Sequence, residues 1–475
     1  MVSVALPLVG PAYTLRSTPL DTQECINLYP EIDETTQGKA PGMLINRPGL
    51  KPFSTLSGLG GVRALYTAAN GTPYAIFANG LYELASDGAA TLRGSMATGG
   101  PYQMADNGLG LAVVDGSQGY FMPFSTNVLG IISDPDFFGT KGVAYLDGYL
   151  IFHDDTQFQV SALLDGTNYD GLDFASAEGS PDTIVSILVD HRELWVFGKR
   201  STEIFFNSGN ASFPLERIQG AYLEQGCAAH GSADKMDNTV YWLGENEDGH
   251  GVVWDAAGYQ PQRISTHAVE TAISRMPDIS DAIAYTYQQA GHSFYVLTFP
   301  QGNQTWVWDA ATRIWHRRSF YETLGFHSRE LPGCHTFAFG KHLVGDWTSG
   351  GIYQLDLDTY TDNGAPMVRD RILPYVANKQ TLNFIRHNRA RLDGEFGVGL
   401  EDGSDPQLSL RISDDGGRTW GNERFRSPGK QGAYRTRVEW YRLGQSVTRA
   451  YWLRTSDPIR TAWYSLVVDL DEGDK

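Results

Sequence analysis

Short apolar runs recur along the chain from about residue 56 to residue 360. Each run is rich in aromatic and β-branched residues, which favour strands, and each is followed by a polar turn and a second run. The runs are spaced about 45 residues apart, a period with paired strands that is typical of a β-propeller. They begin near Tyr74, Leu111, Leu150, Leu194, Val240, Phe294 and Leu343. This pattern predicts an all-β fold with a propeller of six or seven blades. Two tandem β-sandwiches are the alternative.

The stretch from Gly220 to Arg318 departs from simple repetition. Two aromatic hairpins, around residues 240–259 and 293–309, flank a segment with helical spacing. Six apolar residues fall on one face of that segment, and Pro277 ends it: Ile264, Ala268, Val269, Ala272, Ile273 and Met276. The order predicted here is therefore hairpin, short helix, hairpin.

Residues 1–55 show no sustained period. Seven prolines exclude a long helix, namely Pro7, Pro11, Pro19, Pro30, Pro41, Pro48 and Pro52. Apolar residues such as Ile26, Leu28 and Tyr29 provide anchoring points. We therefore expect an extended arm with short strands that lies over another domain.

The segment after Tyr360 alternates strictly between apolar and polar residues in several runs, such as 407–413 and 449–455. This alternation is typical of half-buried strands, so residues 361–475 are expected to form a separate β-sandwich that begins with a linker at 362–366. The predicted domains are an arm at 1–55, a propeller at 56–360 and a sandwich at 361–475.

The net charge of −18 argues against nucleic-acid binding through a basic surface. The charge is uneven, because residues 361–475 hold 15 Arg and 3 Lys against 16 acidic residues, a net of +2, and the other residues carry −20. Arginine is favoured at protein interfaces, so the C-terminal segment is a candidate assembly surface. Drift in composition explains the same numbers equally well.

The sequence shows no apolar run long enough to span a bilayer and no signal-peptide pattern, so we expect no membrane insertion and folding in a cytoplasm. The three cysteines, Cys25, Cys227 and Cys334, are too scattered for a disulfide framework or a zinc site. We interpret them as reduced, buried small side chains.

One complete sequence motif occurs in the C-terminal segment. Residues 413–420 match the Asp-box turn, Ser-x-Asp-x-Gly-x-Thr-Trp, with Ser413, Asp415, Gly417, Thr419 and Trp420 at the defining positions. In this motif the carboxylate bonds backbone amides and the glycine adopts a left-handed conformation. Because it occurs once and outside the propeller, we interpret it as a structural turn.

Other candidate chemistry is weak. The acidic residues that a glycosidase would need are expected in solvated hairpin turns, at Asp154, Asp155, Glu203, Glu245, Glu247 and Asp248. Asp356, Asp358 and Asp362 only partly resemble a calcium loop, and a solvated turn fits them better. His292 and His316 flank strands and are interpreted as hydrogen-bonded structural histidines and not as ligands. We therefore assign no catalytic, cofactor-binding or metal-binding residue.

The ordered motifs of the chain resemble those of one family, the packaged-DNA stabilisation protein of short-tailed bacteriophages, also called the tail hub or nozzle. The matching stretches are 27–31, 48–50, 146–149, 194–203, 213–218, 220–222, 226–228, 240–244, 263–265, 268–270, 281–287, 291–300 and the segment that ends in Trp315-His316. They extend from the arm to about residue 320.

This resemblance implies a structural virion protein, assembled in the host cytoplasm, and no enzyme. It implies a homohexameric ring below the portal and adaptor, contacts with tailspikes or fibres and with a tail needle or plug, and double-stranded DNA passing through without sequence-specific binding. It also implies that the arm packs with the sandwich. The alternative is a glycan-binding or glycan-hydrolysing propeller. Neither the host nor the constriction residues can be derived from the sequence.

Overall fold

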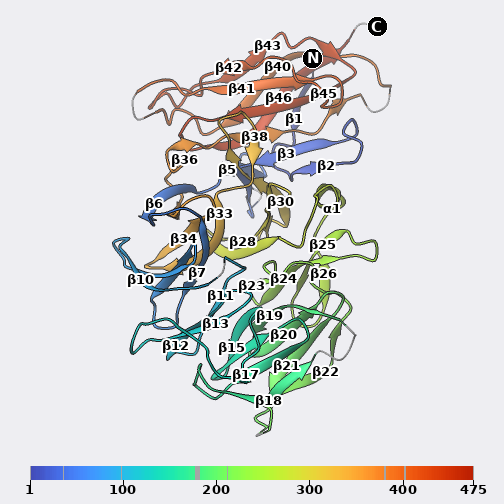
Figure 1. Cartoon of the computed structure of the whole chain (residues 1–475). Helices are drawn as coiled ribbons and strands as arrows, with labels where there is room; N and C mark the ends of the chain where they lie inside the picture. Colours follow the sequence, from blue (N-terminus) through green and yellow to red (C-terminus); the bar gives the residue numbers. More distant parts are fainter. Residues whose placement is uncertain are drawn as a thin grey trace.

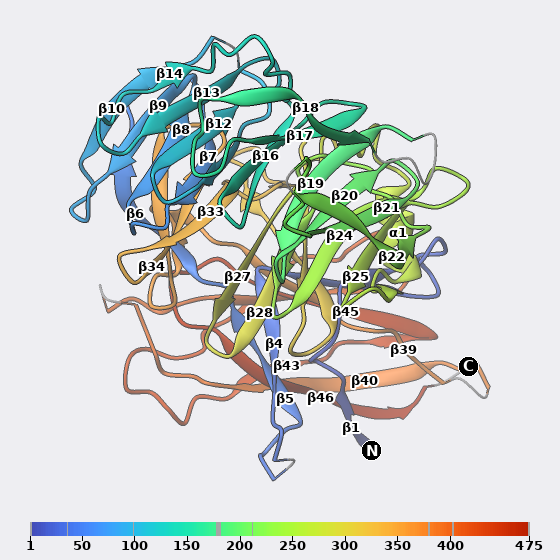
Figure 2. The same ribbon diagram turned by 90° about the horizontal axis from the view of Figure 1, so that it is seen from below.

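The computed structural model describes residues 2–35, 37–97, 99–176, 182–210, 212–378, 381–400 and 403–473. Figure 1 shows two bodies along one long axis, with a propeller at one end and a β-sandwich at the other. Both ends of the chain lie in the sandwich (Figures 1 and 2).

The first four blades are separate four-stranded antiparallel sheets that follow one another in the chain. The first contains β7 (Val62–Thr67), β8 (Pro73–Phe77), β9 (Gly80–Leu84) and β10 (Ala90–Ser95), and the second β11 (Gln103–Asp106), β12 (Gly110–Val114), β13 (Gly119–Pro123) and β14 (Gly130–Ile131). The third contains β15 (Gly142–Leu146), β16 (Tyr149–His153), β17 (Gln157–Ser161) and β18 (Tyr169–Ser176). The fourth contains β19 (Ile184–Asp190), β20 (Glu193–Gly198), β21 (Thr202–Asn207) and β22 (Leu215–Leu223).

The remaining blades continue the same order. The fifth contains β23 (Asp234–Met236), β24 (Thr239–Glu245), β25 (Gly251–Ala256) and β26 (Pro261–Arg263), and the sixth β27 (Ile283–Gln289), β28 (His292–Phe299), β29 (Gln304–Asp309) and β30 (Ile314–Arg318). The last contains β33 (Pro332–Ala338), β34 (Lys341–Asp346), β35 (Gly351–Asp356) and β6 (Gly49–Thr55). A small hairpin of β31 (Phe320–Tyr321) and β32 (His327–Ser328) lies between the sixth and last blades. The described residues therefore form seven four-stranded units, within the predicted range of six or seven.

Each predicted strand core lies in the second strand of a different blade, and all seven anchor residues are buried: Tyr74, Leu111, Leu150, Leu194, Val240, Phe294 and Leu343. Their neighbours pack across the space between blades. Tyr74 and Ile76 of the first blade, for example, share a cluster with Leu111 and Val113 of the second. Because each blade buries its faces against adjacent blades, the ring is stable only as a whole.

The ring is closed by a strand from the N-terminal arm. β6 pairs antiparallel with β35, with Leu50 opposite Leu355 and Gly49 opposite Asp356. The sequence assigns β6 to the arm, whereas its hydrogen bonds place it in the last blade. The domain division at residues 55 and 360 stays a proposal.

The sandwich contains two sheets built from the C-terminal segment and the arm. One sheet contains β1 (Val2–Leu6), β4 (Leu28–Ile32), β5 (Gly42–Asn46), β40 (Ile385–Gly394), β43 (Val438–Tyr441), β44 (Gln445–Ser446) and β46 (Ala462–Glu472). The other contains β2 (Tyr13–Thr14), β3 (Thr22–Ile26), β38 (Arg369–Ile372), β39 (Val376–Ala377), β41 (Leu408–Ser413), β42 (Arg424–Arg426) and β45 (Thr448–Thr455). The predicted packing of the arm with the sandwich is confirmed by strand pairing, since β1 lies antiparallel to β46.

One hydrogen-bonded sheet runs from the propeller into the sandwich. The sixth blade continues through β30 to β3, where Ile26 pairs with Arg317, and then through β38 to β45. Backbone hydrogen bonds therefore connect the two bodies, so their relative position is fixed by strand pairing as well as by side chains.

The segment predicted as a linker is a hairpin. β36 (Thr361–Asp362) and β37 (Ala365–Pro366) pair around Asn363 and Gly364, whose φ angles of 50° and 85° suit a two-residue hairpin turn. Asp362 also pairs in parallel with Leu50. The segment is therefore held against the closing blade.

The helix predicted after the fifth blade is present and shorter than its apolar face suggests. α1 spans His267–Ile273, and the Thr266 hydroxyl accepts a hydrogen bond from the Val269 amide at its N-terminus. Ala268, Val269 and Ile273 are buried, as the pattern predicts.

Candidate functional site

The turn at residues 413–420 has the hydrogen bonds expected of its motif. The Asp415 carboxylate accepts hydrogen bonds from the amides of Arg418 and Thr419 at 3.0 and 2.9 Å, and from the Thr419 hydroxyl at 2.6 Å. The Ser413 hydroxyl donates to Asp415 at 2.8 Å and accepts from the Gly417 amide at 2.9 Å. The Thr419 hydroxyl is the main cause that lowers the pKa of Asp415 to about 2.

The glycine and tryptophan of this motif complete the turn. Gly417 has a φ of +77°, in the left-handed region that favours glycine. The half-buried Trp420 ring meets the edge of Trp452 on β45 with centroids 5.1 Å apart. All donors to the carboxylate come from the turn itself, so we propose that Ser413, Asp415, Gly417, Thr419 and Trp420 have only a structural role.

Two of the acidic residues considered for glycan chemistry have structural partners of their own. Glu203 lies on β21 and not in a turn, is 1% exposed and forms an ion pair of 2.7 Å with Arg217. Asp154 lies in the β16–β17 turn, as predicted, where it accepts hydrogen bonds from the amides of Thr156 and Gln157. Across the described ranges, no group of three or more His, Cys, Asp or Glu side chains could hold a metal ion.

A buried polar junction connects the arm, the propeller and the sandwich. Asn27 lies at its centre with a φ of 57°, and its Nδ2 donates to the carbonyls of Val368 and Ser319 at 2.7 and 3.1 Å. Its Oδ1 accepts from Arg47 Nε at 2.8 Å and from the Ser319 amide at 2.9 Å. One fully buried amide therefore bonds segments from all three parts of the chain.

Arg47 extends this junction to the hairpin after the last blade. Its Nη2 lies 2.8 and 2.7 Å from the two carboxylate oxygens of Asp362, and both side chains are at most 2% exposed. The sequence interpretation of Asp362 as part of a solvated turn is therefore wrong. Its neighbour Asp356 pairs instead with the exposed Lys51.

Three consecutive charged residues on β38 complete the junction on the sandwich side. Arg369 donates to the carbonyls of Ile459, Asp457 and Tyr360, while Arg371 donates to those of Leu8, Pro11 and Glu24. Between them, Asp370 accepts from Arg454 Nε and Nη2, each at 2.7 Å, and lies 2.7 Å from His327 Nε2. These arginines explain part of the C-terminal arginine content without any partner protein.

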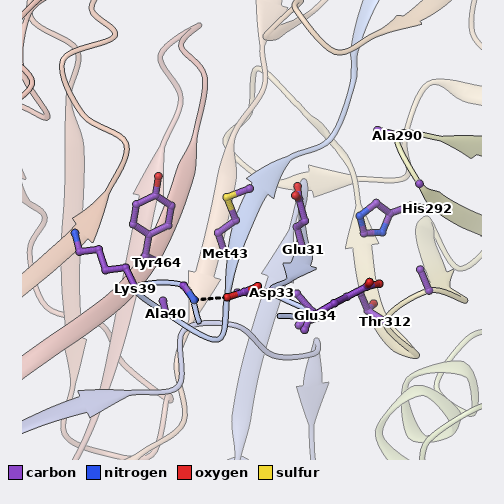
Figure 3. A pocket seen from close by; sticks show the side chains of 15 residues that line it. Glu31, Asp33, Glu34, Lys39, Ala40, Met43, Ala290, His292, Thr312 and Tyr464 are labelled. Atoms are coloured by element: carbon purple, nitrogen blue, oxygen red, sulfur yellow. Dashed lines mark hydrogen bonds between the residues drawn. The ribbon is translucent and has the colours of Figure 1, made fainter. Parts of the chain in front are cut away.

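A groove lies where the arm, the sixth blade and the sandwich meet. We call this cavity of about 790 Å³ the seam groove. In Figure 3, Lys39 and Tyr464 lie on one side and His292 and Thr312 on the other, with Glu31 and Glu34 between them. Ile32, Met43 and Tyr464 provide its apolar surface, and Asp33 accepts the Gly38 amide in the turn between β4 and β5.

Of the two histidines interpreted as hydrogen-bonded structural residues, only His292 has a hydrogen bond among the described residues. His292 Nδ1 lies 2.8 Å from Asp309, and its ring packs against Tyr29. His316 is fully buried, and neither of its ring nitrogens has a hydrogen-bond partner among the described residues. Burial, together with the nearby Arg318, lowers the pKa of His316 to about 3, so the ring is neutral at ordinary pH.

The sequence analysis missed Asn27, Arg47 and Asp370 as junction residues. Asn27 and Arg47 lie in a proline-rich segment with no periodic pattern. Apart from each other, their side-chain partners in the propeller, the hairpin and the sandwich are hundreds of residues away. The available signal was the triplet of charged residues in the apolar stretch at 367–373, because charges inside a strand run must be exposed or paired.

In the part of the chain that the structure describes, no helix is long and apolar enough to cross a membrane. The cysteines are free thiols, with Cys25 and Cys227 buried and Cys334 partly buried. Burial raises the pKa of the Cys25 and Cys227 thiols to about 11, so both are protonated.

Three solved structures resemble the chain at low sequence identity. The extracellular domain of a proposed hybrid two-component system from B. thetaiotaomicron is 10% identical, with a TM-score of 0.45, over 74% of this chain and 45% of that one. The N-terminal domain of Nup159 is 10% identical, with a TM-score of 0.40, over 71% of this chain and 99% of that one. PorZ of the type-IX secretion system of Porphyromonas gingivalis is 11% identical, with a TM-score of 0.40, over 77% of this chain and 45% of that one.

Family comparison covers both bodies of the molecule. No curated protein sequence matches the chain. Residues 4–360 match the family described as bacteriophage P22 Gp10, β-propeller, and residues 373–471 match the one described as bacteriophage P22 Gp10, β-sandwich. The chain therefore belongs to the bacteriophage P22 Gp10 family of structural phage tail proteins.

Proposed function

We propose that this protein is the tail hub, or nozzle, of a short-tailed phage and acts without catalysis. It forms a homohexameric ring below the portal and adaptor, extends the DNA channel, retains the packaged genome and anchors tailspikes or fibres. It also contacts a tail needle or plug, and double-stranded DNA passes through its channel without sequence-specific binding. The observation that carries this proposal is the match of both domains, in order, to one family of virion proteins.

The connection between the two bodies supports a mechanical role. The sheet that runs from β27 through β30, β3 and β38 to β45 ties the propeller to the sandwich by backbone hydrogen bonds. The junction around Asn27 and Arg47 adds buried hydrogen bonds, which are electrostatically stronger in the low-dielectric interior than in water. A conduit under internal pressure requires a connection that does not hinge.

The charge of the chain suits a channel for DNA. Phosphate binding strengthens with each phosphate that the protein neutralises, so a wall that lets a duplex slide must carry few free cations. A net charge of −18 per chain, repeated around a ring, gives a repulsive field that is screened beyond about 8–10 Å at physiological salt. Retention then requires a constriction or a separate plug.

Light scattering combined with size-exclusion chromatography tests this function on the full-length protein. The expected result is a hexameric mass, alone or after addition of the adaptor, and six-fold density below the portal in electron microscopy of the virion. A protein that stays monomeric with the adaptor and is absent from particles would overturn the proposal. We infer that the protein is folded in the host cytoplasm before it joins the virion.

The glycan-directed alternative gains no specific support. Among the candidate carboxylates, Glu203 is already paired with Arg217, and Asp154 accepts a hydrogen bond from a backbone amide of its own turn. Hydrolysis of a polysaccharide by the purified protein would be the observation in its favour.

A further inference from the structure

The inference concerns how copies of this chain contact one another, and it rests on the proposed ring. A segment of the sandwich that we call the basic loop, residues 424–437, contains five basic residues and no acidic one: Arg424, Arg426, Lys430, Arg435 and Arg437. Once this +5 is set aside, the −18 of the whole chain leaves −23 for the other 461 residues. The basic loop is thus a cationic patch on an acidic protein.

The backbone of the basic loop is held by hydrogen bonds, and the Arg426 guanidinium donates to the carbonyls of Glu439 and Phe425, whereas three other cations of the loop have no ion-pair partner in the described part of the chain. Its backbone is fixed to residue 397, because the Gly397 amide donates to the Pro428 carbonyl at 3.0 Å and the Gly432 amide donates to the Gly397 carbonyl at 2.9 Å. Lys430, Arg435 and Arg437 are exposed, and none of them has an ion-pair partner among the described residues.

Neighbouring arginines of the sandwich behave differently. Arg389 and Arg391 pair with Asp469 and Glu439, and Arg454 pairs with Asp370. The basic loop therefore gathers, within residues 430–437, three exposed cations that have no ion-pair partner in the described ranges. Because the backbone of the loop is already ordered, its binding to an acidic surface loses little further backbone entropy.

Aromatic side chains accompany these charges. Tyr434 and Phe425 are 75% and 52% exposed within the basic loop, and Tyr441, which follows the loop, is 54% exposed. β42 and β43 lie at the end of the sandwich away from the propeller (Figure 1). Aromatic residues together with arginine are the composition of binding hot spots.

The seam groove has the complementary chemistry. Its surface includes Ile32, which is 44% exposed, together with Met43 and Tyr464, and its rim includes the exposed carboxylates of Glu31 and Glu34. Neither glutamate has a hydrogen-bond or ion-pair partner in the described part of the chain. Glu31 lies near the end of β4 and Glu34 in the turn that follows it, and this hairpin projects from the body of the molecule below the β5 label in Figure 2.

We propose that the basic loop of one copy docks in the seam groove of the next copy. Tyr434 meets the apolar surface of the groove, while Arg435 and Arg437 face Glu31 and Glu34. The two surfaces are different parts of the same chain, so the contact is head-to-tail and generates a ring when its rotation closes. The acidic groove repels duplex DNA and is suited to this cationic protein segment.

Charge reversal in two separate variants tests the contact. The groove variant carries Glu31→Arg and Glu34→Arg, and the loop variant carries Arg435→Glu and Arg437→Glu. Each variant alone is expected to associate at least about tenfold more weakly, since like charges then face each other across every interface. A 1:1 mixture is expected to recover the wild-type mass, because groove-variant and loop-variant copies can alternate around an even-numbered ring.

The readouts are light scattering and native mass spectrometry, with melting curves to confirm that each variant is folded. Lys199→Glu with Arg200→Glu, in an exposed turn of the fourth blade, is the matched control and should leave association unchanged. If either variant still forms a ring of wild-type mass, or if the 1:1 mixture stays dissociated, the docking contact is refuted. The proposed function would not be affected by that result.

Two further outcomes separate the contact from the function. A wild-type chain that forms no ring under any condition would overturn the proposed ring together with this interface. A loop variant that keeps the ring but no longer binds the adaptor or duplex DNA would assign the basic loop to that partner and refute the docking proposal.

Discussion

Arg47 and Asp362 lie 315 positions apart in the chain and form an ion pair that is almost completely shielded from water. Arg47 comes from the arm and Asp362 from the hairpin that follows the last blade, so the pair joins the two ends of the propeller segment. Removal of one partner leaves an uncompensated buried charge, which is far more costly than the loss of a surface pair.

We therefore predict that Asp362→Ala lowers the free energy of unfolding by about 3–5 kcal/mol. Lys51→Ala, which breaks the exposed pair with Asp356, should lower it by about 1 kcal/mol or less. Urea denaturation followed by tryptophan fluorescence measures both. Equal effects of the two substitutions would show that the buried pair does not stabilise the junction.

A second prediction concerns the tryptophans of the sixth blade. Trp306 and Trp308 are 4% and 8% exposed and share one core cluster with Trp315, as their two-residue spacing predicts. Trp306→Ala should cost about 3–5 kcal/mol of stability, measured by chemical denaturation. Trp347→Ala, at a ring that is 38% exposed and lies under the Arg329 guanidinium, should cost about 1 kcal/mol or less. An unchanged melting curve for Trp306→Ala would contradict this packing.

Acid sensitivity follows from the buried histidines. His316, with its pKa lowered to about 3, and His153, with its pKa lowered to about 4, both chiefly by burial, stay neutral when folded. In the unfolded chain they take up protons below about pH 6.5. The unfolded state therefore binds more protons between pH 6.5 and 3, and stability falls as the pH decreases through this window.

The substitution His316→Phe isolates this effect, because phenylalanine keeps the ring contacts with Tyr29 and Phe294 and cannot be protonated. The variant should lose less stability than the wild type between pH 7 and pH 5. The exposed His250→Asn serves as the control and should leave the slope unchanged. Parallel pH profiles for wild type and His316→Phe would rule out this contribution.

The Asp415 turn gives a local prediction. Asp415→Ala should remove hydrogen-exchange protection at the amides of Arg418 and Thr419 and leave the propeller unaffected. With its pKa lowered to about 2, the carboxylate stabilises the turn above about pH 4 and loses this role as the pH falls toward 2. Exchange measured by mass spectrometry checks both points. Loss of a ligand or of an activity in this variant would contradict a purely structural role.

Duplex DNA provides the last prediction. The isolated protein should show no measurable binding to a labelled duplex of about 20–30 base pairs near 0.15 M salt, by fluorescence anisotropy, because the acidic surface outweighs the basic loop. Tight binding at that salt concentration would contradict a channel through which DNA slides freely.

The strands that the sequence reveals are those buried on both faces. Leu111, Leu194 and Leu343 all lie in the second strand of a blade, where every position packs against a neighbouring blade. The first strands of the blades have more polar positions, as in β7, which includes the exposed Arg63, and β11, which begins with Gln103 and ends with Asp106, so their apolar signal is weaker. The repeat was therefore visible, whereas the full set of strands was not.

The junction could not be predicted for a different reason. The contacts of Asn27 with Ser319 and Val368 join positions about 300 residues apart, and no local pattern encodes them. The periodicity of a sequence indicates which positions are buried. The contacts of Asn27 form only when the arm, the propeller and the sandwich have folded together.

The closing strand β6 has a consequence for the nascent chain. During synthesis β6 stays unpaired until β35 leaves the ribosome, and β1 stays unpaired until β46, the last strand among the described residues, is made. An unpaired strand of this kind is a template for aggregation, and proline and short strand length are common protections against it. The arm carries seven prolines and no strand longer than seven residues. The sequence of the arm is therefore suited to remaining unpaired without aggregating during synthesis, as well as to pairing in the folded protein.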